Sequence, residues 1–292
     1  SGSPYQIGNH YLPFAPSFFV RDEAGANHAL RLTSGEQPDI HNSLNFVDLP
    51  SSPPDQILAE FDLRMAPGTG RADGMGFALL NSAFYSSSLP AAPTSGAEEP
   101  NFAGSLGIGF DIFRNADGAG EESNNHVSLH FNNQLLREFD VTSIGDLANG
   151  KWIHAQLVLR PGGGDSDVSL LLTQEGRPHC AVIDRFKVAG FTPYLGRLRF
   201  AARTGGSAAT QEIDNVTAHF ANFTQPIFGL ESGCISVEER NQSIHLTIVR
   251  SGNLNQPATV QFATQDESAT AGVDYTHMAG TFTFQKGEIS KT

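Results

Sequence analysis

Oxygen-bearing side chains are concentrated between residues 111 and 125, in a segment that could bind a hard cation. Acids and amides follow one another there at short intervals: Asp111, Asn115, Asp117, Glu121, Glu122, Asn124 and Asn125. Carboxylates gathered in one loop repel one another unless water or a cation relieves the repulsion. Calcium prefers about six to eight oxygen ligands of mixed type. The segment therefore predicts either a calcium site or a solvated hairpin loop.

Strand-like stretches flank this loop and must position it. Apolar residues occupy alternate positions of residues 107–113 and again of residues 126–131, as is typical of strands with one buried face. Asp111 then lies on the face opposite to Ile108 and Phe110. We expect a strand, the acid-rich loop and a second strand, with the loop held at the edge of a sheet.

This segment resembles the metal-binding loop of the L-type (legume-like) lectins. The similarity rests on the run Phe110-Asp111-Ile112-Phe113-Arg114-Asn115 and on the strand that starts at His126. The resemblance implies that calcium is bound by the carboxylate of Asp111, the backbone carbonyl of Phe113 and the amide oxygen of Asn115. A later acid would close the site: Glu121 lies nearest to the spacing in the family, and Asp117 and Glu122 compete with it.

The position two residues before Asp111 differs from the plant members of the family. Those members have a glutamate there, which helps to bind a second, transition-metal ion, whereas this chain has Gly109. We therefore expect calcium to be the only cofactor. We interpret His126 as an ordinary strand histidine rather than as a metal ligand.

Further motifs resemble the sugar-binding parts of the same family. The run Ala72-Asp73-Gly74-Met75-Gly76-Phe77 implies a cis peptide bond before Asp73 and a carboxylate that accepts hydrogen bonds from sugar hydroxyls. The run from Ala202 to Gly206 implies that the backbone of Gly205 and Gly206 contacts the sugar. Asn115 would present its amide to the same ligand. Phe113 would be either an aromatic floor for the sugar or a core residue.

The strand patterns and the absence of a convincing long helix predict an all-β chain. We expect residues 1–221 to form a concanavalin-like jelly-roll β-sandwich of the L-type lectin kind, and residues 222–229 to form a linker. Residues 230–292 resemble the opening strands of a Calx-beta module, through Ala269-Thr270-Ala271-Gly272-Val273-Asp274-Tyr275 and the Gly280 to Phe284 run. The sequence stops before the last strands of that module, so we expect an incomplete immunoglobulin-like β-sandwich.

Composition excludes several classes of function. The formal net charge of −13 argues against nucleic-acid binding, which requires clustered lysine and arginine. No apolar run is long enough to insert into a membrane as a spanning helix. Cys180 and Cys234 are too few for a disulfide framework. We interpret them as two buried thiols rather than a bridge.

These observations predict a calcium-dependent carbohydrate-binding domain of an extracellular or cell-surface adhesion protein. Its partners would be a glycan or polysaccharide, and other cell-surface molecules are a second expected class. One alternative is a structural or protein-binding sandwich that has lost sugar binding. The other is a glycan-acting hydrolase, but Glu60 and Asp62 begin an acidic strand pattern that no second glutamate completes. With no recognisable catalytic motif, we do not expect an enzyme.

Overall fold

The structure is a computed structural model, and the all-β prediction is confirmed in the part of the chain that it describes. It describes residues 5–9, 18–21, 28–46, 53–85, 96–115, 123–162, 165–174, 176–177, 179–192, 194–221, 225–231, 243–254, 256–267 and 269–292. All the regular elements in these ranges are strands, and they fall into two compact units, Ser1–Ala221 and Asn222–Thr292.

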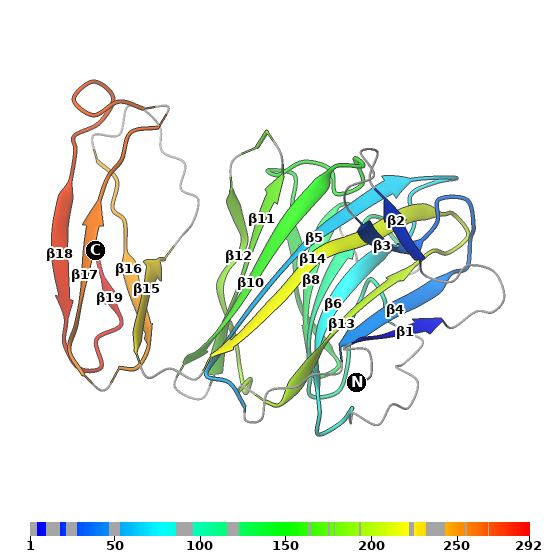
Figure 1. Cartoon of the computed structure of the whole chain (residues 1–292), viewed down its shortest axis with the longest axis horizontal. Coiled ribbons are helices and arrows are strands. Elements are labelled where there is room, and N and C mark those ends of the chain that lie inside the picture. The colour runs from blue at the N-terminus through cyan, green and yellow to red at the C-terminus, as the bar shows by residue number, and fades with distance from the viewer. Residues whose placement is uncertain are drawn as a thin grey trace. The chain divides into compact units, whose positions relative to one another are not determined.

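The first unit is a sandwich of two seven-stranded antiparallel sheets that lie face to face (Figure 1). The first sheet has the order β1 (Tyr5–Asn9), β4 (His41–Phe46), β13 (Gly196–Arg203), β6 (Gly74–Asn81), β7 (Leu106–Asp111), β8 (His126–Phe131), β9 (Gln134–Asp140). The second sheet has the order β12 (Cys180–Val188), β11 (Asp165–Gln174), β10 (Trp152–Gly162), β5 (Gln56–Pro67), β14 (Ala209–Ala221), β3 (His28–Thr33), β2 (Phe18–Arg21).

Aromatic side chains join the two sheets at the centre of the core. Burial alternates strictly along β5, so Phe61 points inward and is fully buried. Its ring lies 5.7 Å from that of Phe77, 6.1 Å from that of Phe110 and 4.9 Å from that of Phe200, measured between centroids. Since these three partners belong to β6, β7 and β13, one side chain of the second sheet packs against three strands of the first.

The backbone of residues 97–100 lies unusually close to the first sheet of this unit. Residues 97–100 run across three glycines of β6 and β7 without room for a side chain between them. A Cβ added to Gly76 would lie 2.3 Å from the carbonyl oxygen of Ala97, one on Gly107 would lie 2.0 Å from that of Pro100, and one on Gly109 would lie 2.2 Å from that of Glu98. We call residues 97–100 the strap.

The second unit contains a three-stranded and a two-stranded antiparallel sheet. Their strands are β15 (Pro226–Leu230), β16 (Ile248–Gly252) and β19 (Ser290–Lys291), and β17 (Ala258–Ala263) and β18 (Ala279–Phe284). Residues 226–229, which we expected in a linker, instead lie in β15 and pair with β16. The linker prediction is therefore wrong for these residues, because their backbone is part of a sheet.

Three strands of the first unit differ from what the sequence predicts. Residues 1–27 are predicted to be loop-rich but contain β1 and β2. Strand β12 has no clean alternation that would predict it, because register shifts interrupt its pairing with β11. Cys180 in β12 is a free, half-buried thiol, and Cys234 lies outside the described residues. None of the described segments is a helix with the length and apolar character needed to cross a membrane.

The strap makes Gly109 sensitive to substitution. We expect Gly109→Ala to lower the free energy of unfolding by about 1–3 kcal/mol, because the added methyl group must displace backbone. Gly206→Ala is the matched control, since a Cβ there meets nothing within 4 Å. Chemical denaturation of both variants tests this, and equal stabilities would contradict the tight packing of the strap.

Candidate functional site

Asp73 lies at the start of β6 and is held by backbone contacts on both sides. The peptide bond between Ala72 and Asp73 is cis, as the family resemblance implies. The N–H of Asp73 donates to the carbonyl oxygen of Arg203 at 2.9 Å, and its own carbonyl accepts from the N–H of Ile112 at 3.0 Å. Asp73 therefore links the end of β13 to the start of the acid-rich loop.

The Asp73 carboxylate forms an ion pair that the sequence did not predict. Arg203 Nε lies 2.9 Å from Asp73 Oδ2, and the same nitrogen donates to Glu98 Oε2 at 3.0 Å. Arg203 Nη2 donates to the other Glu98 oxygen. Burial raises the pKa of Glu98, while the attraction of Arg203 opposes that rise. One guanidinium group thus serves two carboxylates, both of which are buried.

Gly205 lies directly against the carboxylate of Asp73. A Cβ on Gly205 would be 3.1 Å from both carboxylate oxygens of Asp73. The Gly205 carbonyl accepts from the N–H of Asp39 at 3.0 Å, which fixes this loop. Gly206 is the next residue and has open space where its side chain would be.

Asp111 ends β7 beside the Asp73 segment. It pairs with Gly74 in the register of β6 and β7, and it is completely buried. Its Oδ1 accepts the N–H of Phe113 at 2.6 Å, which turns the chain into the loop. Phe113 is 37% exposed, so it is not a core residue, and Asn115 is half-buried.

The structure therefore brings together five of the predicted residues, Asp73, Asp111, Phe113, Gly205 and Gly206, on neighbouring strand ends and loops, and Asn115 follows on the same loop as Phe113. Asp117, Glu121 and Glu122 lie outside the described residues, so the identity of a closing acid stays a prediction.

Asp111 also belongs to a second cluster, together with Glu99 and His126. One ligand atom from each lies within 4.8 Å of the others, an arrangement that could hold a metal ion. Glu99 comes from the strap, which crosses the sheet at Gly109. A carboxylate from another segment thus reaches the neighbourhood of Asp111 beside Gly109.

Hydrogen bonds and ion pairs organise the same cluster. His126 Nδ1 donates to the carbonyl oxygen of Ser123 at 2.9 Å, and its Nε2 faces Glu99 at 3.8 Å and Glu138 at 3.9 Å. Glu99 also contacts His130 Nε2 at 2.5 Å and accepts from Ser128 Oγ at 2.8 Å.

The charges of these groups support an ion pair within the cluster. Burial lowers the pKa of His126, but the pull of Glu99, Asp111 and Glu138 outweighs it and raises the pKa to about 9. Burial raises the pKa of Glu99, but its contacts with His126 and His130 lower it to about 2. These shifts are those of an ion pair between Glu99 and His126, and the interpretation of His126 as a strand histidine rather than a metal ligand stays a prediction.

This cluster predicts a specific pH dependence of stability when metals are chelated. A group whose pKa is lower in the folded state stabilises the fold at pH values above its ordinary pKa. A group whose pKa is raised stabilises the fold at pH values below its ordinary pKa. The contribution of Glu99 should therefore be lost as the pH falls from 4.5 to about 2, and that of His126 as the pH rises from 6.5 to about 9. Denaturant unfolding across this range should show a weaker alkaline decline in His126→Gln than in the wild type. Identical profiles would contradict the assignment.

Comparison with solved structures finds lectins. Peanut lectin with a nine-residue peptide is 12% identical, has a TM-score of 0.50 and is matched over 74% of this chain and 99% of its own. Lectin II from Ulex europaeus is 10% identical, with a TM-score of 0.52 and coverage of 74% and 93%. The exoplasmic/lumenal domain of VIP36 in its Ca2+/Man-bound form is 14% identical, with a TM-score of 0.51 and coverage of 77% and 86%. At such identities the likeness shows the fold.

Comparison with protein-family models identifies the C-terminal part. Residues 222–292 match the Calx-beta domain, so the match begins at the start of the second unit rather than at residue 230. No curated protein sequence matches the chain. The chain thus combines a jelly-roll sandwich with the fold of legume and L-type lectins and a C-terminal Calx-beta domain.

Proposed function

We propose that the first unit is a calcium-dependent carbohydrate-binding domain of an extracellular or cell-surface adhesion protein. The observation that carries this proposal is the meeting of Asp73, Asp111 and Gly205. Asp111 pairs with the residue that follows Asp73, and Gly205 packs against the Asp73 carboxylate. A carboxylate suited to calcium and one suited to sugar hydroxyls therefore lie on adjacent strands.

Calcium would be bound by oxygen atoms of three kinds. Asp111 supplies a carboxylate, Phe113 a backbone carbonyl and Asn115 an amide, and an acid of the adjoining loop, Glu121 or Asp117, would complete the set. Hard oxygen ligands of mixed type suit calcium better than a transition metal. The fit is supported by Asp111, because a completely buried carboxylate is costly unless cations or hydrogen bonds compensate its charge. When bound, calcium would supply such charge and fix the loop.

The glycan would contact residues on either side of the metal loop. Asp73 accepts hydrogen bonds from sugar hydroxyls, Asn115 donates through its amide, and Gly205 and Gly206 allow the ligand to approach the backbone. The half-exposed ring of Phe113 offers an apolar surface for the sugar. A single site of this kind binds weakly, so adhesion would depend on several sites acting together.

The setting of the protein is part of the same proposal. The net charge of −13 suits calcium binding at a cell surface, and a polysaccharide or another cell-surface molecule would be the partner. We propose no catalytic role, no nucleic-acid partner and no membrane insertion.

One observation favours the structural or protein-binding alternative. Asp73 Oδ2 is already paired with Arg203, so part of the carboxylate is engaged before any ligand arrives. If that pair only stabilises the loop, the unit would keep the fold without binding sugar. In the sugar-binding function Asp73 contributes to glycan affinity, whereas in the structural function it contributes only to the stability of the loop. The second experiment below measures this difference.

Calcium should stabilise the first unit. Calcium at about 100 times its dissociation constant should add about 2.7 kcal/mol to the free energy of unfolding, because only the native state binds it. Scanning calorimetry with calcium and then with excess chelator should show the larger transition at a higher temperature with calcium. Asp111→Asn should remove most of the difference. An unchanged transition in the wild type would contradict the calcium site.

Replacing Asp73 should weaken sugar binding and leave calcium binding intact. Asp73→Asn removes the charge from a hydrogen-bond acceptor, so we expect about a tenfold or greater loss of affinity. Binding to immobilised galactose-terminated and mannose-terminated glycans in calcium measures this, with Asp62→Asn on the second sheet as control. A wild type that binds calcium but none of these glycans would support the structural alternative.

A further inference from the structure

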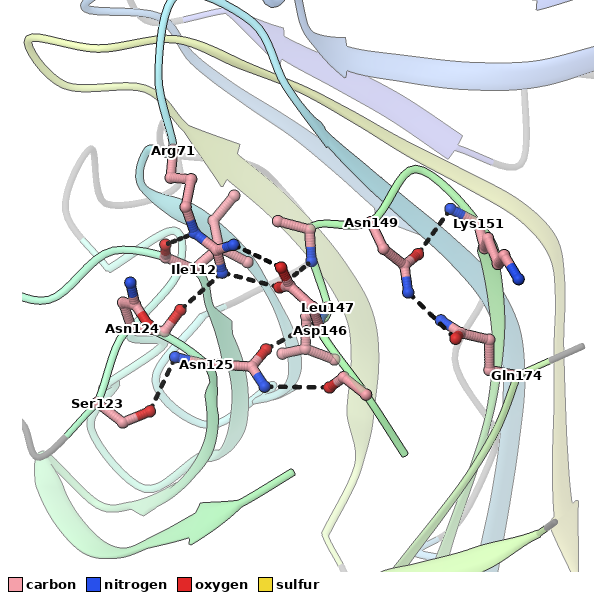
Figure 2. Close-up of polar contacts among 12 residues, drawn as sticks. Arg71, Ile112, Ser123, Asn124, Asn125, Asp146, Leu147, Asn149, Lys151 and Gln174 are labelled. Atoms are coloured by element: carbon pink, nitrogen blue, oxygen red, sulfur yellow. Dashed lines mark hydrogen bonds and ion pairs between the residues drawn. The ribbon is translucent and has the colours of Figure 1, made fainter. Parts of the chain in front are cut away.

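Arg71 makes an unusual set of contacts two residues before Asp73. Its Nε donates to the carbonyl oxygen of Ile112 at 3.2 Å, and its Nη2 donates to the carbonyl oxygen of Asn124 at 3.0 Å. Figure 2 shows the guanidinium group between these two carbonyls and the carboxylate of Asp146. Every nitrogen of the side-chain fork therefore has a partner, although 29% of the side chain is exposed.

The two carbonyls mark the two ends of the acid-rich loop. Ile112 stands between Asp111 and Phe113, both of which we propose as calcium ligands, and Asn124 closes the loop before β8. One side chain from a different segment thus holds the entry and the exit of the loop together. Fixing both ends reduces the conformational freedom that calcium would otherwise have to remove.

Asp146 neutralises the charge that this arrangement places near a cation site. Its two oxygens lie 2.6 and 2.8 Å from Arg71 Nη1 and Nη2, in a bidentate pair. The hydrogen bond from Arg71 is the main cause of the lowered pKa of Asp146, so this carboxyl is ionised at neutral pH. Without Asp146 the guanidinium group would repel calcium through its uncompensated charge.

Asn125 joins the segment around Asp146 to the same loop. Its Nδ2 donates to the carbonyl oxygen of Gly145 at 3.0 Å, and its Oδ1 accepts the N–H of Leu147 at 2.8 Å. Figure 2 shows Asn125 between Asn124 and the segment of Asp146 and Leu147. The residues that hold Asp146 in place are thereby fixed to the end of the loop that Arg71 also binds.

We propose that Arg71 and Asp146 are positioning residues of the calcium site, which preform the acid-rich loop by clamping both of its ends. This inference rests on the proposed function, because it assigns to these residues an effect on calcium affinity. Lysine could not replace Arg71, since an ammonium group lacks the planar fork that reaches two carbonyls and a carboxylate together.

Calcium titration calorimetry of the whole chain tests the proposal. We expect Arg71→Met and Arg71→Lys each to raise the calcium dissociation constant about 10-fold or more, in the range seen when partners of metal ligands are removed. Asp146→Asn should also raise it, and more strongly at low salt because screening reduces the effect of an uncompensated charge. Arg185→Met is the matched control, since Arg185 is a similarly exposed arginine paired with Asp167 in the second sheet.

The outcomes separate this inference from the calcium proposal itself. If the wild type binds calcium and both Arg71 variants bind it equally well, the clamp is wrong and the calcium site stands. If only Arg71→Lys retains wild-type affinity, charge rather than clamping matters and the proposal is overturned. If the wild type binds no calcium, the proposed function fails and the clamp fails with it.

A second measurement distinguishes positioning from general stability. The apo form of Arg71→Met should unfold only slightly below that of Arg185→Met, because each loses a partly exposed ion pair and Arg71→Met also loses the hydrogen bonds to the carbonyls of Ile112 and Asn124. Only Arg71→Met should show a reduced calcium-induced rise in unfolding temperature. A large drop in the apo unfolding temperature of Arg71→Met, with the calcium-induced rise unchanged, would show a merely structural role.

Discussion

The end of the first unit that carries Asp73 and Asp111 depends on the close approach of the strap to the first sheet. Backbone carbonyls of residues 97–100 lie where side chains of β6 and β7 would otherwise stand, and three glycines make this contact. Two consecutive acids on the strap then point to different partners. Glu98 reaches Arg203, and Glu99 reaches His126 and His130. The same backbone therefore organises both sides of Asp111.

Electrostatic compensation explains the ion pairs at the end of the sandwich that carries Asp73 and Asp111. Asp73, Glu98 and Asp111 are buried at one end of the sandwich, and ionised groups removed from water need nearby opposite charge. Arg203 forms ion pairs with Asp73 and Glu98, and the side chains of His126 and His130 contact Glu99. Arg71 lies outside this group and is balanced by Asp146. In the proposed function, calcium would be the further positive charge that the loop acids require.

Local patterns in the sequence predicted the elements but not the contacts between distant ones. Apolar residues at alternate positions identified the two strands that flank the acid-rich loop, which are β7 and β8 in the structure. The motifs around Asp73 and Asp111 were recognisable because their residues are contiguous. Strand β12 lacked a signal because register shifts disrupt its alternation.

The roles of Glu98, Arg203 and Arg71 depend on partners far away in the chain. Arg203 and Glu98 are separated by 105 residues, and Arg71 and Asp146 by 75. No periodicity or short motif encodes such pairs. The sequence does offer one signal for the strap, in the glycines at positions 76, 107 and 109. Glycine inside a strand often marks a place where another backbone lies in close contact.

The strap also constrains how this site can change in evolution. A glutamate at position 109 would have to occupy space already filled by the carbonyl of Glu98. A lineage could gain that side chain only after the crossing segment had been shortened or moved. The two ways of supplying an acid beside Asp111 are therefore mutually exclusive, and no single substitution connects them.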